Sequence, residues 1–99
     1  MANPAHHDEG RRLRKIATAP GVLISYTDHA LERMAERGIS RLDVRHVLKT
    51  GFVARVEMNK GEETWNVRGT DLDERDLEIV IVAYDEVIRI KVISAWERR

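Results

Sequence analysis

The feature that most constrains the fold of this sequence is a change in apolar spacing at Gly51 and Phe52. Before that point apolar residues recur every three or four positions, as they do along one face of a helix. Beyond it they alternate with polar residues, as in half-buried strands. The chain has 99 residues, enough for one hydrophobic core but not for two. We therefore expect a single α+β fold in which helices precede most of a sheet.

Two short helices are expected before the change of spacing. Thr27 or Asp28 can cap the first, and Gly38 lies where a left-handed residue commonly ends a helix. Ser40 can cap the second, which ends at Gly51. Because the connection between them is so short, the two helices must pack antiparallel or at an angle.

The N-terminal residues 1–21 are expected to form an arm or a short helix. Leu13, Ile16 and Ala17 would make a narrow apolar stripe if the segment is helical. Terminal segments are often loose, so a solvated arm stays open as the alternative. Residues 22–99 are expected to form the single α+β domain.

Five strands are expected, at residues 22–26, 52–58, 64–70, 77–84 and 87–96. A turn signal follows the second of them, and Asp85-Glu86 is expected to form a tight hairpin before the last. The acidic residues 71–76 are expected to be a loop. Short turns between consecutive strands favour antiparallel pairing. We therefore expect an antiparallel sheet of four to five strands with two or three helices packed on one side.

Composition and motifs exclude several classes of protein. The chain has no cysteine, which rules out disulfide scaffolds, thiolate nucleophiles and cysteine-based zinc sites. No apolar run approaches the length of a membrane span, and the first ten residues lack the layout of a signal peptide. Patterns for metalloproteases, nucleotide-binding loops and serine hydrolases are also missing. We expect a cytoplasmic protein that uses no metal or cofactor and binds no membrane.

The charges of the chain are unevenly distributed. The net charge is zero, which argues against a protein that coats nucleic acid without specificity. Residues 1–49 hold nine Lys or Arg against six Asp or Glu, while residues 50–99 hold eight against eleven. The helical part is therefore positive and the strand part negative, which favours an anion-binding surface on the helices.

One face of the first expected helix carries His29, Arg33 and Arg37. At 100° per residue, the two arginines fall about 40° and about 80° from the histidine, beside the apolar side. Arginine matches the oxygens of a phosphate, and histidine moves protons near neutral pH. Together they are a minimal set for cleaving a phosphodiester without metal. The alternative is an ordinary solvated face, on which Glu32 and Glu36 pair with the arginines.

Other candidates lie on the strands. Arg68, Arg89 and Lys91 occupy polar positions and would add phosphate contacts if they line the same groove. The alternative is cross-strand pairing with acidic residues. Three aromatic residues could stack on bases, but core or edge packing is the favoured explanation for them: Trp65, Tyr84 and Trp96.

The segment Tyr26 to Ser40, YTDHALERMAERGIS, carries a pattern that resembles a family. Its H-A-x-x-R-M-x-E-R-G-I-S motif resembles the hallmark of a small bacterial domain family of unknown function. That family is similar to the BrnT and RelE-like toxins of bacterial toxin–antitoxin systems. The resemblance covers roughly residues 22–96. It implies a compact sheet with helices on one side and a metal-independent ribonuclease that acts on messenger RNA.

The same resemblance implies roles for particular residues. It puts His29 and Arg33 in the site with Arg68, and Arg37 beside them as a residue that binds substrate. The last strand is similar to the end of BrnT, whose basic residues correspond here to Arg89 and Lys91 and would also bind substrate. The implied partners are RNA and a cognate antitoxin that covers the site. The chain would then exist as a homodimer or as a toxin–antitoxin hetero-oligomer.

The resulting hypothesis is attack of the ribose 2′-hydroxyl on the adjacent phosphate. His29 would act as general base or acid, with Glu36 or Glu57 as its partner. Arg33 and Arg68 would stabilise the pentavalent phosphate. Whether the domain is catalytic stays open, because a binding module could dock a protein or nucleic acid through the same helix face. The exposed edge of the last strand could then pair with a partner's sheet or with a second copy.

Overall fold

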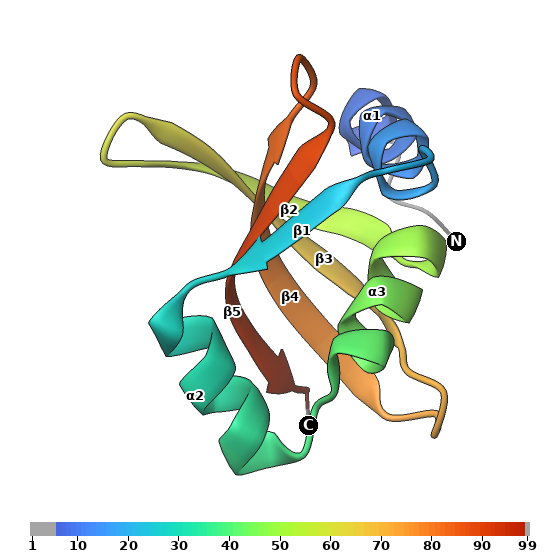
Figure 1. Ribbon diagram of the computed structural model, residues 1–99, viewed down its shortest axis with the longest axis vertical. Coiled ribbons are helices and arrows are strands. Elements are labelled where there is room, and N and C mark those ends of the chain that lie inside the picture. The colour runs from blue at the N-terminus through green and yellow to red at the C-terminus, as the bar shows by residue number, and fades with distance from the viewer. Residues whose placement is uncertain (1–5, 99) are drawn as a thin grey trace.

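The computed structural model describes residues 6–98, and they form an α+β fold (Figure 1). Three helices and five strands follow one another as α1 (His7–Ala17), β1 (Leu23–Tyr26), α2 (Asp28–Arg37), α3 (Arg41–Thr50), β2 (Phe52–Asn59), β3 (Glu62–Thr70), β4 (Asp76–Tyr84) and β5 (Arg89–Glu97). This is the expected element order, with the first helix present. Residues 1–5 of the expected N-terminal segment lie outside the described residues. Within residues 6–98, no helix is long and apolar enough to cross a membrane.

The sheet is mixed, with the strand order β1-β5-β4-β3-β2. The last four strands pair antiparallel, as their short turns predict. The first strand differs, because β1 pairs parallel with β5, from Leu23 opposite Arg89 to Tyr26 opposite Val92. This pairing joins the two ends of the domain, so no local turn signal could reveal its direction. It also places β5 inside the sheet, so its N-terminal half is not the exposed edge that the sequence suggested.

All three helices contribute to one hydrophobic core on one face of the sheet. Figure 1 shows α3 crossing β3 and β4, while α2 lies beside β5. The apolar stripe expected on α1 is confirmed, since Leu13, Ile16 and Ala17 are buried. On the strands, alternate residues enter the same core, which is typical of a sheet covered on one face: Trp65, Val67, Leu77, Ile79, Ile81, Ile90 and Val92.

The connection between β4 and β5 is longer than the expected two-residue hairpin. The turn spans residues 85–88, and Ile88 adopts a positive φ of 46°. Val87 and Ile88 are exposed in this turn. The strand therefore begins at Arg89, two residues later than its apolar pattern suggests.

The end of α3 approaches β3 too closely for any side chain at Gly51. A Cβ placed there would lie 2.4 Å from the carbonyl oxygen of Arg68 and 2.7 Å from that of Val47. Both obstacles are backbone atoms, which cannot rotate away. The Gly51 carbonyl also accepts a hydrogen bond of 2.9 Å from Arg14 Nη2, which fixes α1 at this junction.

Gly51→Ala is therefore expected to lower the free energy of unfolding by about 2 kcal/mol through overpacking. Gly10→Ala is the matched control, because a Cβ at that helical position meets no atom of residues 6–98 within 4 Å. It should raise the free energy of unfolding by about 0.5 kcal/mol through helix propensity. Urea denaturation of the two variants tests this contrast. Equal stability of both variants would contradict the close approach at Gly51.

Candidate functional site

The local sequence fixes both ends of α2. Thr27 is the cap, since its side-chain oxygen accepts from the backbone N–H of Ala30 at 3.0 Å. Its hydroxyl also donates to the carbonyl of Ile93 at 3.1 Å, which ties the start of α2 to β5. Gly38 ends the helix in the left-handed conformation, with φ of 63°, as expected.

The buried side of α2 is narrower than its sequence suggests. Ala30 and Met34 are buried in the core, whereas Leu31 is half-buried and Ala35 is exposed. The row of His29, Arg33 and Arg37, hereafter the α2 row, lies beside this buried side as the helical spacing requires. His29 and Arg37 are exposed and Arg33 is half-buried.

The side chains of the α2 row are little used by the fold. In the part of the chain that the structure describes, the His29 and Arg37 side chains make no hydrogen bond or ion pair. Arg33 Nη1 lies 3.1 Å from Glu36 Oε1 on the next turn. Its Nε is fully buried and has no hydrogen-bond partner among residues 6–98. Burying an N–H group without a hydrogen-bond partner costs roughly 1–3 kcal/mol of folding free energy. Packing alone therefore does not explain why the Arg33 Nε is left in this state.

The strand candidates lie on the other face of the sheet, hereafter the open face. Arg68 flanks the buried Val67, and Arg89 and Lys91 flank the buried Ile90, so all three point away from the core. Within residues 6–98, no hydrogen bond or ion pair joins them to the α2 row. The α2 row therefore stands as a separate group of residues.

Each cation of the open face already has a partner. Arg68 Nε is 3.9 Å from Glu78 Oε1, and its guanidinium lies 5.9 Å from the centre of the Phe52 ring. Lys91 Nζ is 3.4 Å from Glu62 Oε1. These contacts are the cross-strand pairs that the sequence left open as an alternative.

The fold also engages Arg89 and two of the three aromatic candidates, Tyr84 and Trp65. Arg89 donates to Ser25 Oγ at 3.4 Å and lies 5.2 Å from the centre of the Tyr84 ring. Trp65 is only 2% exposed and belongs to the core, which excludes base stacking by this ring. Trp96 is half-buried on β5.

A buried ion pair that the sequence analysis missed supports the far end of α2. Arg75 Nε donates to Asp71 Oδ2 at 2.6 Å, and the Asp71 side chain is completely buried. The same guanidinium donates to the carbonyls of Arg37 and Gly38 at 2.9 and 3.0 Å. Arg75 therefore fastens the β3–β4 loop to the α2–α3 turn. The expected acidic loop therefore contains a buried ion pair whose arginine also bonds two backbone carbonyls.

The charges around Asp71 explain its protonation behaviour. Burial alone would raise the pKa of Asp71, but hydrogen bonds from the Arg75 backbone, the Arg75 side chain and the Asp73 backbone outweigh it and lower the pKa. Asp43, Asp71 and Asp73 bring carboxylate oxygens within 4.8 Å of one another. Arg75 supplies a positive charge inside this group, at 3.4 Å from Asp43 Oδ2.

Two further cations, Arg41 and Arg45, lie in the first half of α3. The guanidinium of Arg41 lies 5.0 Å from the centre of the Tyr26 ring, and Arg45 is one helical turn further on. Burial raises the pKa of the Tyr26 hydroxyl, while the charges of Arg41 and Arg45 oppose the rise. Both arginines are exposed. Their spacing of four residues on one helix was the available sequence signal.

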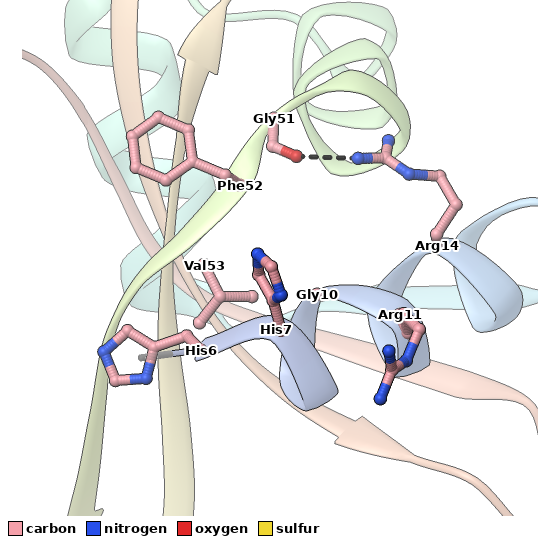
Figure 2. Close-up of a pocket in the computed structure, with 8 residues that line it drawn as sticks. All are labelled: His6, His7, Gly10, Arg11, Arg14, Gly51, Phe52 and Val53. Carbon is pink, nitrogen blue, oxygen red and sulfur yellow. Dashed lines mark hydrogen bonds between the residues drawn. The ribbon is translucent and has the colours of Figure 1, made fainter. Parts of the chain in front are cut away.

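One hollow of the surface contains none of the expected site residues. It has a volume of about 340 Å³ and lies between the start of α1 and the start of β2. Figure 2 shows the His7 ring standing between these elements, with Arg14 reaching the Gly51 carbonyl. Arg11 pairs with Asp8. His6 is the N-cap residue of α1 and His7 is its first residue, so both lie at the start of this helix.

Comparison with known proteins identifies a family but no characterised relative. A family model described as "Domain of unknown function (DUF4258)" matches residues 26–97. This range contains the motif and both α2 and the open face. No curated protein and no solved structure matches the chain.

Proposed function

The chain belongs to the DUF4258 family, a domain of unknown function, and we propose that it binds and cleaves RNA through the α2 row. The reaction is a metal-independent cleavage of the phosphodiester backbone. In the cell the domain acts in the cytoplasm as the toxin of a toxin–antitoxin pair. The antitoxin covers the α2 row and neutralises it. The toxin role rests on the resemblance of the motif to BrnT and RelE-like proteins.

The observation that carries this proposal is the contrast between the two groups of cations. Arg68, Arg89 and Lys91 are held by acidic or polar neighbours. Among the described residues, the His29 and Arg37 side chains keep their full hydrogen-bonding capacity, and Arg33 pairs only with Glu36 of its own helix, at 3.1 Å. Polar groups that the fold leaves unsatisfied are more consistent with a ligand than with a structural purpose.

The chemistry follows from the residue types. His29 takes the proton of the ribose 2′-hydroxyl, and the 2′-oxygen forms a bond to the adjacent phosphorus. The bond from phosphorus to the 5′-oxygen breaks, and water protonates the leaving oxygen. Arg33 and Arg37 hold the phosphate and stabilise its added negative charge. The products are a 2′,3′-cyclic phosphate and a 5′-hydroxyl.

Two carboxylates, Glu57 and Glu36, were suggested as partners of His29. Glu57 lies on β2, at the opposite edge of the sheet from β1, and its nearest cation is Arg55 at 3.8 Å. It therefore cannot orient His29. Glu36 is on the same helix and bonds Arg33 instead. Its effect on the reaction is to hold Arg33 in place.

A second candidate is a binding module that uses the same row without catalysis. The observation that favours it is the exposure of His29, which has no side-chain partner among residues 6–98 to orient its ring. A catalytic histidine usually has such a partner. For a binding module, RNA affinity should fall steeply with salt, and His29→Gln should change it little.

The two candidates are separated by incubating the purified protein with RNA and with DNA of the same sequence in the presence of a chelator. The proposal expects cleavage of RNA alone, with cyclic phosphate ends, because DNA lacks the attacking hydroxyl. Cleavage of both nucleic acids, or a requirement for added divalent metal, would refute this mechanism. Binding of RNA without cleavage would support the binding module instead.

A further inference from the structure

One long strand at the margin of the sheet has an unpaired side. In the described part of the chain, β2 pairs with β3 alone, so its other edge offers backbone donors and acceptors. Figure 1 shows the tip of the β2–β3 hairpin projecting beyond the rest of the sheet. Met58 is 68% exposed on this strand. An unpaired edge of this kind is a ready template for pairing with another strand.

The hairpin turn determines which backbone groups face outward. Lys60 and Gly61 both have positive φ, 51° and 81°, and connect the paired residues Asn59 and Glu62. A two-residue turn of this kind is closed by a hydrogen-bonded pair. Since bonded and non-bonded positions alternate, the backbone of Glu57 bonds to β3.

The same alternation then assigns the neighbouring residues. The backbone of Arg55 also bonds to β3, whereas those of Val56 and Met58 point outward. The irregularity of β2 lies before Arg55, so it does not disturb this pattern. The outward groups are therefore centred on Val56.

In one register, the charges of β2 are complementary to those of a second copy of β2. If two copies of β2 pair antiparallel with Val56 opposite Val56, then Arg55 of each copy lies opposite Glu57 of the other. Arg55 and Glu57 are 65% and 48% exposed, so both can reach a second strand. They occupy non-hydrogen-bonded positions, where facing side chains are closest. Slipping the register by two residues puts Arg55 opposite itself or Glu57 opposite itself, which is repulsive.

We propose that the occupant of the β2 edge is a second copy of this chain, paired antiparallel through β2 about Val56. The pairing makes one continuous sheet across a two-fold axis. Two Arg55–Glu57 ion pairs, one on each side of Val56, fix its register. The proposal is independent of the function of the α2 row.

The test uses charge exchange on exposed residues, which leaves the fold intact. Wild type is expected to be a dimer in sedimentation velocity, and Arg55→Glu and Glu57→Arg should each weaken it about tenfold or more. Mixing the two single variants should restore a dimer, because both facing pairs then have opposite charges. The double variant should also dimerise as wild type does. A wild type that stays monomeric throughout a dilution series, or a mixture that stays monomeric, would overturn the proposal.

A cysteine scan provides an independent readout, since the chain has no cysteine of its own. In the proposed register, the two Val56 Cα atoms are about 5.5 Å apart, within the range of a disulfide. Val56→Cys should therefore form a covalent dimer under mild oxidation. Met58→Cys is the control, because its two copies would be roughly 13 Å apart along the strands. Equal crosslinking of both variants would contradict this register.

Discussion

Replacing Asp71 by alanine is expected to lower the free energy of unfolding by about 3 kcal/mol. The substitution leaves the Arg75 guanidinium without its nearest counter-ion, at 2.6 Å. It also removes the acceptor for the backbone N–H groups of Asp73 and Arg75, both at 2.8 Å. Urea denaturation at neutral pH measures the loss. Hydrogen exchange at Gly38 should rise with it, because Arg75 fastens the α2–α3 turn.

Asp76→Ala is the matched control for this prediction. Asp76 also pairs with an arginine, Arg98 at 3.2 Å, but its side chain is 51% exposed. An exposed pair of this kind contributes less than about 1 kcal/mol. If the two variants lose the same free energy of unfolding, then the buried Asp71–Arg75 pair stabilises the fold no more than an exposed pair does.

The Asp71 effect should depend on pH with a defined sign. The folded state lowers the pKa of Asp71 below its ordinary value of 3.8. The stabilisation is therefore complete above that value and is lost as pH falls through the lower folded pKa. The difference between wild type and Asp71→Ala should be constant near neutral pH and should shrink below about pH 4. A difference that grows on acidification would contradict the lowered pKa.

The second large effect is expected at His29. His29→Gln should reduce RNA cleavage about 100-fold to 10,000-fold, because glutamine cannot take the hydroxyl proton. RNA affinity should stay close to that of wild type, since Arg33 and Arg37 still hold the phosphate. The rate of cleavage is measured on a labelled RNA. The affinity is measured by fluorescence anisotropy on a DNA-substituted analogue of that RNA, which is not cut.

His46→Gln is the control for the loss of an imidazole. His46 lies on α3 and is half-buried, and it is outside the α2 row. Its substitution should leave cleavage unchanged. If His29→Gln cleaves as fast as wild type, His29 is not the base of the reaction.

Local signals allowed much of the fold to be predicted from the sequence. Thr27, Gly38 and Ser40 act on residues within one helical turn, so their effect can be read from the adjacent sequence. Alternating apolar residues likewise identified the strands. The direction of β1 could not be predicted, because its partner β5 lies at the other end of the chain. Pairing over such distances depends on the whole domain.

The difference between local signals and long-range contacts also applies to the candidate site. The helical spacing of the α2 row was visible in the sequence, because it depends only on the geometry of one helix. The pairing of Arg68 with Glu78 and of Lys91 with Glu62 was not visible, because it depends on the order and register of the strands in the sheet. Arg75 was missed for a related reason. It bonds the carbonyls of Arg37 and Gly38, which carry no side-chain signal.

Expression of wild type and of the His29→Ala/Arg33→Ala variant in a bacterial host tests whether the α2 row makes this domain a toxin. Growth and the integrity of total RNA are followed after induction, and circular dichroism establishes that both purified proteins fold equally well. Only wild type is expected to stop growth and fragment RNA. If neither protein affects growth or RNA, or if both do so equally, the α2 row is not the site of an RNA-cleaving toxin.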